Sequence, residues 1–180
     1  MVADPFQVAL GDRRDKRVPF HVVRRGELSQ ALLADVDSRV PAGAVAVADV
    51  VLEPFDGGLA VNGTVSSHWE GECRRCLAEV GGELKAEVRE LFRRGGGEAE
   101  GTYPMTDEQV NLRDMVMDNL FAALPLLPLC RDDCAGICAL CGANRNDEPC
   151  GCAEVVIDPR WAGLELVRGQ LEGTGLAEGD

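Results

Sequence analysis

The sequence has no apolar run that approaches the roughly 20 residues a membrane-spanning helix requires. The stretch from Met1 to Phe20 carries no apolar segment of signal-peptide length behind a basic start. We therefore expect a cytoplasmic protein that does not enter the membrane. Thiols stay reduced in that compartment, so the eight cysteines of the chain point to metal ligation rather than to disulfides.

Residue patterns typical of enzymes are scarce as well. The only two histidines are His21 and His68, and no Ser/His/Asp or Cys/His grouping comes near a plausible pocket. The glycine-rich stretch "RRGGGE" from Arg93 lacks the spaced lysine and the helix of a phosphate-binding loop. We therefore expect a non-enzymatic protein.

The charge of the chain is unevenly distributed. The formal net charge is −13; residues 1–25 carry +3 and residues 26–180 carry −16. Nucleic-acid binding depends on Lys and Arg that neutralise phosphates, and the chain as a whole repels phosphates. An acidic surface instead attracts basic partners.

Three segments predict β-strands because they are rich in β-branched residues or alternate apolar with charged residues. They are "AVAVADVVLEPF" from Ala44, "LAVNGTVSSHWEGE" from Leu59 and "LAEVGGELKAEVRELF" from Leu77. The turn residues Asp56 and Gly57 separate the first two segments. We expect an antiparallel meander with a cysteine pair at its second reversal.

A helix is expected in "NLRDMVMDNLFAALP", with Asn111 as N-cap and Pro125 as the stop. The predicted fold class is α+β, an antiparallel β-meander packed with a helix, followed by a cysteine-rich zinc-binding C-terminal module. The expected layout is an N-terminal segment at 1–40, a meander-plus-helix core at 41–129, a zinc module at 130–164 and a disordered acidic tail at 165–180.

The eight cysteines divide into two sets of four, the number of thiolates that closes a tetrahedral zinc site. The spacing favours one site from Cys73, Cys76, Cys130 and Cys134, and a second from Cys138, Cys141, Cys150 and Cys152. The second set closes locally, because Cys138-x2-Cys141 forms a knuckle whose glycine lets the turn close. The first set joins a hairpin tip to the end of the helix. We expect two zinc ions.

The spacing leaves alternatives open. Cys73 and Cys76 can be grouped with Cys150 and Cys152, or a single site can be filled. An iron–sulfur cluster also suits the thiolate count. A redox role for the Cys73–Cys76 pair has little support, since nothing in the sequence except two neighbouring arginines would lower a thiol pKa.

Several spaced motifs resemble the YceD family, also called DUF177, in its cysteine-rich bacterial form. The motifs are "GECRRCL", "ALPLLPLC", "CAGICALCGANRNDEPCGC" and "IDPRWAGL". The family pattern falls on Cys73, Arg75, Cys76, Pro125, Pro128, Cys130, Cys134, Cys138, Cys141, Gly142, Asn144, Cys150 and Cys152. Ala139 stands where such knuckles often carry proline.

The resemblance implies a role in the accumulation of 23S ribosomal RNA and in large-subunit assembly, since such genes commonly lie beside one for a small ribosomal protein. The partner would be precursor 23S rRNA, contacted by Arg74, Arg75, Arg93 and Arg94 on one edge together with the basic cluster at 13–17, or a basic ribosomal protein of the large subunit. A metal-dependent nuclease and a redox- or zinc-sensing protein are the alternative functions.

Overall fold

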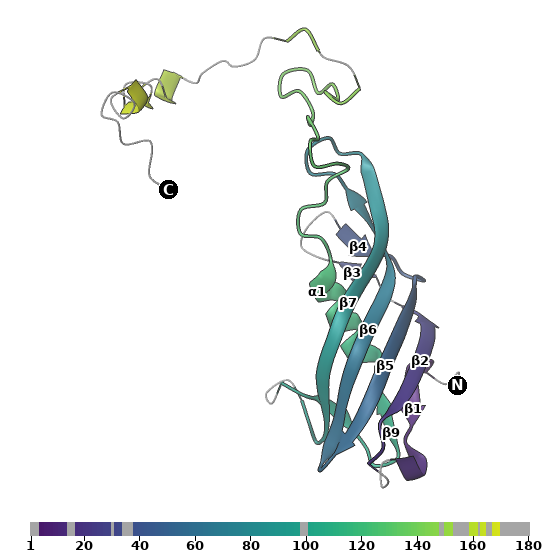
Figure 1. Ribbon diagram of the computed structural model, residues 1–180. Coiled ribbons are helices and arrows are strands. Elements are labelled where there is room, and N and C mark those ends of the chain that lie inside the picture. Colours follow the sequence, from purple (N-terminus) through teal and green to yellow (C-terminus); the bar gives the residue numbers. More distant parts are fainter. Residues whose placement is uncertain are drawn as a thin grey trace.

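The computed structural model describes residues 4–13, 17–29, 31–33, 38–97, 101–147, 150–152, 159–161, 163–164 and 167–169. These residues form an elongated body in which a long, curled sheet encloses a short helix, and the cysteine-rich segment extends from one tip of the sheet (Figure 1). None of the described helices is long and apolar enough to cross a membrane.

Three long strands build the centre of the sheet. They are β5 (Val45–Phe55), β6 (Gly58–Glu72) and β7 (Glu79–Arg94), and consecutive strands are antiparallel. The turn between β5 and β6 falls at the expected Asp56-Gly57, where Gly57 has a positive φ of 86°. Strands β6 and β7 pair over their whole lengths, from Gly58 opposite Arg93 to Glu72 opposite Glu79. The three segments predicted as strands are therefore strands.

Six shorter strands extend this centre to a sheet of nine among the described residues. They are β1 (Gln7–Ala9), β2 (Phe20–Glu27), β3 (Leu32–Leu33), β4 (Ser38–Val40), β8 (Tyr103–Met105) and β9 (Gln109–Asn111). One edge is made by β2 on β5 and by β4 and β3 beside the end of β6. On the other edge β8 runs parallel to β7, and β9 and β1 follow antiparallel.

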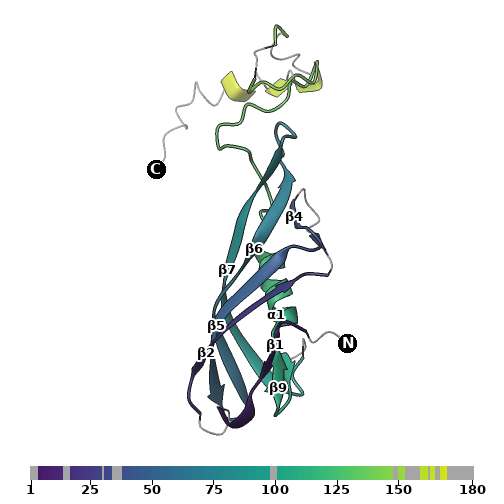
Figure 2. The same cartoon turned by 90° about the vertical axis from the view of Figure 1, so that its right-hand side faces the viewer.

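The expected meander packed with a helix corresponds to only part of this fold. The chain is mostly β-sheet, curled around a small helix, and the long strands β5 to β7 are flanked by strands that do not follow in meander order (Figures 1 and 2). Four strands of the sheet, β1 to β4, lie within the N-terminal segment expected at 1–40. The acidic tail expected at 165–180 lies outside the described residues except for 167–169.

The close approach of β5 and β6 depends on Gly63 in the middle of β6. Its φ is 154°, and a Cβ at this position would lie 2.3 Å from the carbonyl oxygen of Asp49 on β5. Any larger residue would force the two backbones apart. Gly63 thus permits the tight pairing of two central strands of the sheet.

The helix α1 (Arg113–Ala123) lies in the hollow of the curled sheet (Figure 2). It buries Met115, Val116 and Leu120 against the apolar inner face of the strands. The N-cap position is Leu112 rather than the expected Asn111. The side chain of Asn111 still satisfies a backbone donor at the start of the helix, since its Oδ1 accepts the N–H of Arg113 at 2.9 Å. Two short 3₁₀ turns, η1 (Gly11–Arg13) and η3 (Pro159–Trp161), complete the described elements.

An ion pair fastens the N-terminal segment to the start of α1. Both oxygens of Asp4 accept hydrogen bonds from Arg113, at 2.7 and 2.9 Å, and the two side chains are about three-quarters buried. Asp4 also accepts the backbone N–H of Phe6 and the side-chain amide of Asn111. The hydrogen bond from Arg113 outweighs the effect of burial and lowers the pKa of Asp4 to about 2.

Candidate metal centres

The hairpin that joins β6 to β7 carries two buried cysteines, Cys73 and Cys76. The backbone N–H of Cys73 donates to Ala78 O at 2.8 Å, and that of Leu77 donates to Cys73 O at 2.9 Å, which closes a tight turn. Leu77 takes a left-handed φ of 60°, a strained conformation for a residue with a side chain. The turn leaves Cys73 and Cys76 buried side by side at the tip.

The segment after α1 brings two further cysteines to this tip. The carbonyl of Pro128 accepts the backbone N–H of Arg74 at 3.0 Å, which docks the segment against the hairpin. The four sulfur atoms of Cys73, Cys76, Cys130 and Cys134 then all lie within 4.8 Å of one another. We call this group the hairpin site; Cys130 is exposed and the other three cysteines are buried.

The remaining four cysteines form a second group, the tail site. Cys138, Cys141, Cys150 and Cys152 also place their sulfur atoms within 4.8 Å of one another. The knuckle closes because the backbone N–H of Gly142, at φ 75°, donates to Cys138 O at 2.8 Å. The alanine at 139 does not prevent this turn. Only Cys138 of the four is buried, so the tail site is the more accessible one.

Each group of four thiols could hold one metal ion, and the sulfur–sulfur distances of the hairpin site match a tetrahedron. In the hairpin site the sulfur atoms of Cys73 and Cys134 are 3.8 Å apart and those of Cys76 and Cys130 are 3.6 Å apart. A tetrahedron of thiolates about 2.3 Å from zinc has edges of roughly 3.8 Å. A disulfide would need about 2.05 Å, and all eight cysteines are free thiols. The grouping is the one that the spacing favoured.

Backbone hydrogen bonds favour ionisation of Cys73 in the hairpin site and of Cys138 in the tail site. Burial raises the pKa of Cys73, but backbone hydrogen bonds from Cys76, Arg75 and Cys130 outweigh it and lower the pKa to about 6. Backbone hydrogen bonds from Cys141 and Leu140 likewise lower the pKa of Cys138 to about 6. Donors aimed at a sulfur atom stabilise a thiolate, the form that binds metal.

The neighbouring thiols are affected in the opposite direction. Cys134 raises the pKa of Cys130 to about 12, and Cys141 raises that of Cys152 to about 12. A second negative charge so close to the first is unfavourable unless a cation offsets it. Each group is therefore suited to a dication, whose charge would stabilise all four thiolates.

The arginines predicted to contact a partner do not share one edge. Arg74 and Arg75 lie at the hairpin tip, whereas Arg93 and Arg94 lie at the opposite end of β7 (Figure 1). The guanidinium of Arg93 stacks 5.4 Å from the ring centroid of Phe55. Arg94 donates to Asp107 at 3.0 Å. Of the basic cluster at 13–17, residues 14–16 lie outside the described residues.

Arg75 is part of the metal centre itself. Its guanidinium donates to Cys134 O at 3.0 Å and to Asp132 O at 3.4 Å, and its carbonyl accepts the N–H of Ile137 at 2.9 Å. These bonds link the hairpin tip to the loop that carries Cys134. The sequence had suggested that Arg75 contacts a partner at the surface. Its bond to a carbonyl more than 50 residues away leaves no pattern in the sequence around it.

Asn146 is a residue of the centre that the sequence analysis missed. Its side chain donates to the sulfur of Cys134 at 3.3 Å. Burial raises the pKa of Cys134, but the hydrogen bonds from Asn146 and from the backbone of Gly136 lower it overall. Its position between Cys141 and Cys150 could have suggested this role, because polar side chains near metal ligands often orient them.

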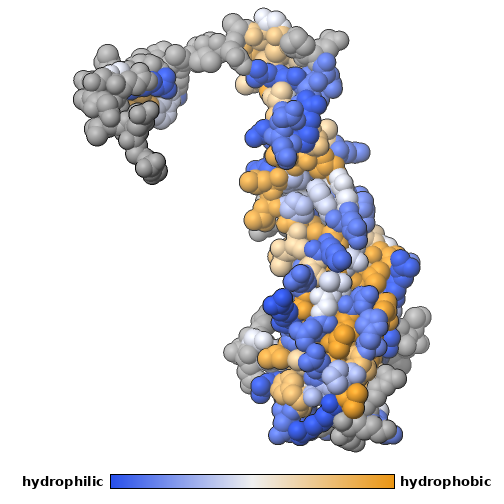
Figure 3. Space-filling view, in the orientation of Figure 1, coloured by the Kyte–Doolittle hydropathy of each residue, from blue (hydrophilic) through white to orange (hydrophobic). Residues whose placement is uncertain are grey.

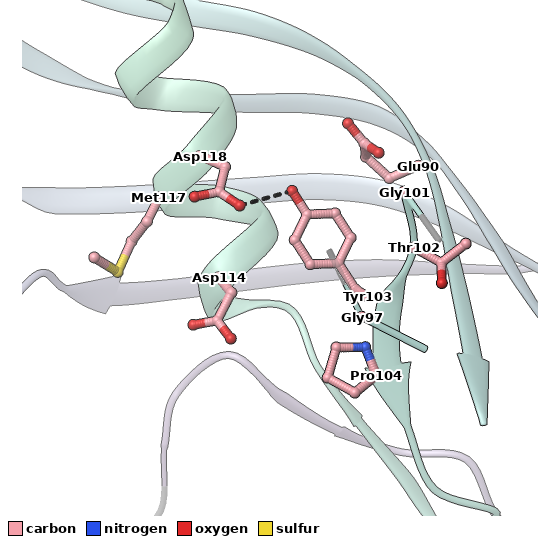
Figure 4. Close-up of a pocket in the computed structure, with 9 residues that line it drawn as sticks. All are labelled: Glu90, Gly97, Gly101, Thr102, Tyr103, Pro104, Asp114, Met117 and Asp118. Atoms are coloured by element: carbon pink, nitrogen blue, oxygen red, sulfur yellow. Dashed lines mark hydrogen bonds between the residues drawn. The ribbon is translucent and has the colours of Figure 1, made fainter. Parts of the chain in front are cut away.

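A pocket of about 500 Å³ lies apart from the cysteines, between α1 and β8 (Figure 4). Three carboxylates line it, from Glu90 on β7 and from Asp114 and Asp118 on α1. Tyr103 donates its hydroxyl to Asp118 at 2.9 Å, and burial together with that carboxylate raises the pKa of Tyr103. These carboxylates come from two separate elements, so no local motif announced them. They add to the acidic surface of the protein.

Exposed apolar side chains gather beside the segment that follows α1 (Figure 3). Leu126 and Leu127 are 68% and 67% exposed, and Phe121 at the end of the helix is 49% exposed. The adjoining Pro128 and Leu129 lead directly into the hairpin site.

Comparison with known proteins identifies a family whose model covers the residues of both sites. A family model described as "Large ribosomal RNA subunit accumulation protein YceD" matches residues 61–167. An uncharacterized protein of Mycobacterium tuberculosis is 36% identical over 128 residues, 68% of this chain and 61% of that protein. One of Mycobacterium leprae is 33% identical over 122 residues, 64% of this chain and 56% of that protein. The chain thus spans about three-fifths of the length of these relatives. No solved structure matches it.

Proposed function

Since the chain belongs to the YceD family of large ribosomal RNA subunit accumulation proteins, we propose that it is a non-enzymatic factor for the accumulation of 23S rRNA and the assembly of the large ribosomal subunit. The family match carries this proposal, because it covers 61–167 and therefore all eight cysteines. The protein would act in the cytoplasm, where bacterial ribosomes are assembled.

The metal in this proposal is zinc with a structural role. Each group offers four soft thiolates whose sulfur atoms lie within 4.8 Å of one another, the donor set of closed zinc sites. A catalytic zinc keeps one position open for water or substrate and usually has histidine or carboxylate ligands. The donor sets therefore favour a stabilising role over a metal-dependent nuclease.

The direct partner in this proposal is a basic ribosomal protein of the large subunit. The net charge of −13 would speed and orient an encounter with a basic chain and oppose contact with phosphates. Three of the four arginines suggested for RNA contact interact with other residues of this chain. Arg75 donates to a backbone carbonyl, Arg93 stacks on the ring of Phe55, and Arg94 donates to the carboxylate of Asp107. They are also divided between two ends of the sheet.

A binding experiment distinguishes the two partners. The full chain is titrated with isolated large-subunit proteins and, separately, with a 23S rRNA transcript, each at low and high salt. We expect saturable binding of a basic ribosomal protein that weakens with salt. Tight RNA binding that is weakened by Arg74→Ala, with no protein partner recovered, would instead assign RNA as the partner.

A cellular experiment tests the function itself. Removal of the gene from its host should lower the ratio of 23S to 16S rRNA and reduce free large subunits in sucrose gradients. The intact gene should restore the ratio, and a gene carrying Cys73→Ser with Cys76→Ser should not. An unchanged ratio in the deletion strain would contradict the proposed function.

A further inference from the structure

One side chain joins the two cysteine sites. Asn146 belongs by position to the tail site, since it lies in the loop between Cys141 and Cys150. Its Nδ2 nevertheless donates to the sulfur of Cys134, a member of the hairpin site, at 3.3 Å. A side chain from the loop of the tail site therefore contacts a ligand of the hairpin site.

The amide of Asn146 is held in a single orientation. Its Oδ1 accepts the backbone N–H of Ala135 at 2.8 Å and Nη2 of Arg131 at 2.9 Å. Its Nδ2 donates to Asn144 Oδ1 at 2.7 Å as well as to Cys134. Both amide hydrogens and the amide oxygen are in use, so the donor to the sulfur cannot rotate away without breaking other bonds. Three of the four partners lie in the segment 131–135 that carries Cys134.

The position of this loop depends in turn on the tail site. A short antiparallel bridge pairs Ile137 with Asn144 and lays the loop back against the chain that enters the knuckle. Backbone hydrogen bonds of 2.8 Å hold it there, from Cys138 to Ala143 O, from Gly142 to Cys138 O and from Arg145 to Gly136 O. Cys141 and Cys150 bound the loop at its two ends, so a metal that binds both would limit the movement of the residues between them.

We propose that Asn146 is a positioning residue that couples the two metal sites. Metal in the tail site fixes the loop 142–147, and the fixed loop keeps an N–H on the Cys134 sulfur, which strengthens metal binding at the hairpin site. The effect is reciprocal, because coupling between two binding sites acts equally in both directions. This inference rests on the proposed structural role of metal in both sites.

Cadmium tests the inference directly, since it takes the same thiolate ligands and each site gives its own ¹¹³Cd resonance. The full chain is loaded with ¹¹³Cd²⁺, and the hairpin resonance is identified as the one that persists in Cys141→Ser. In Asn146→Asp the oxygen acceptors remain but the N–H donors are lost. We expect this change to shift the hairpin resonance and, by chelator competition, to weaken metal binding at the hairpin site about tenfold. Asn62→Asp, the same change at an exposed position of β6, should leave both values unchanged.

The tail-site variant supplies an independent arm. Cys141→Ser should weaken binding at the hairpin site to a similar degree, and adding Asn146→Asp should weaken it no further, because both changes remove the same bond. Two metals bound by the wild-type chain, with an unchanged hairpin affinity in Asn146→Asp and in Cys141→Ser, would show that the sites are independent and overturn the coupling alone. A chain that binds no metal would overturn the coupling together with the proposed metal role.

Discussion

The sulfur atoms of Cys73 and Cys134 lie 3.8 Å apart although 61 positions separate the two residues in the sequence. The contact closes a loop that contains β7, β8, β9 and α1. Metal at this point would therefore stabilise the curled sheet and not only the tip. Loss of a structural metal belongs to the small group of changes that cost more than about 4 kcal/mol of unfolding free energy.

Replacing Cys134 tests this role. Cys134→Ser should reduce the metal content from two ions per chain to one or fewer and lower the unfolding free energy by about 4 kcal/mol. Elemental analysis and denaturant titration measure the two effects. Cys152→Ser is the matched control: it should also remove one metal but leave the sheet far more stable, because the tail site lies beyond the tip (Figure 1). Equal destabilisation by the two variants would contradict the claim that metal in the hairpin site stabilises the sheet more than metal in the tail site.

Arg75 is expected to act on metal retention rather than through its charge. Arg75→Ala removes the guanidinium bonds to the carbonyls of Cys134 and Asp132, and should speed release of the hairpin metal to a chelator about tenfold. Arg89→Ala serves as the control, since Arg89 is 82% exposed and its ion pair is with Glu87, which is 80% exposed. Release at the wild-type rate from Arg75→Ala would mean that these bonds do not support the site.

Gly63→Ala should disrupt the sheet. The added Cβ would lie 2.3 Å from Asp49 O and 2.7 Å from the Cα of Val50, both backbone atoms of the neighbouring strand. We expect a loss of about 3 kcal/mol or more, measured by thermal or denaturant unfolding. The same substitution at Gly97, where a Cβ meets nothing within 4 Å, should change stability by less than about 1 kcal/mol. Similar stability of the two variants would contradict the tight packing of β6 against β5 at Gly63.

The features that the sequence predicted well are those whose signal is local. The alternation in β7 and the two-residue spacing of Cys138 and Cys141 are each readable within a few positions. The short strands β1, β3, β4, β8 and β9 were missed because two or three residues carry no periodicity. Their pairing is set by the curl of the sheet, which no single segment encodes.

In the candidate sites, too, the sequence predicted what has a local signal and missed what depends on contacts between distant residues. The spacing of the cysteines suggested the grouping, but not the bonds of Arg75 and Asn146 to the Cys134 segment, which join residues 59 and 12 positions apart. An asparagine in a cysteine-rich loop has many possible uses, and only the folded loop shows which sulfur it meets.

The Asp4–Arg113 pair predicts a defined dependence of stability on pH. The folded pKa of Asp4 is about 2, below the unfolded value of about 3.9. The pair therefore contributes its full stabilisation above about pH 4 and loses it as the pH falls toward 2. With a quarter of each side chain exposed, the contribution is about 1 to 2 kcal/mol.

The measurement compares wild type with Asp4→Asn by denaturant unfolding from pH 7 downward. Wild type should be more stable at pH 7, and the difference should shrink below about pH 4. Metal loss at low pH affects both proteins, so the difference isolates Asp4. Asp56→Asn, in an ion pair whose carboxylate is 95% exposed, should differ little from wild type at any pH. A difference that stays constant with pH would contradict the ion-pair explanation.

The most direct test of the account is the metal content of the chain, measured by native mass spectrometry on protein purified without a metal-binding tag under reducing conditions. The geometry of the hairpin and tail sites predicts two zinc ions per chain, and removal of both by a strong chelator should unfold the sheet. A metal-free chain with eight free thiols and an intact fold, or a chain that carries iron, would contradict it.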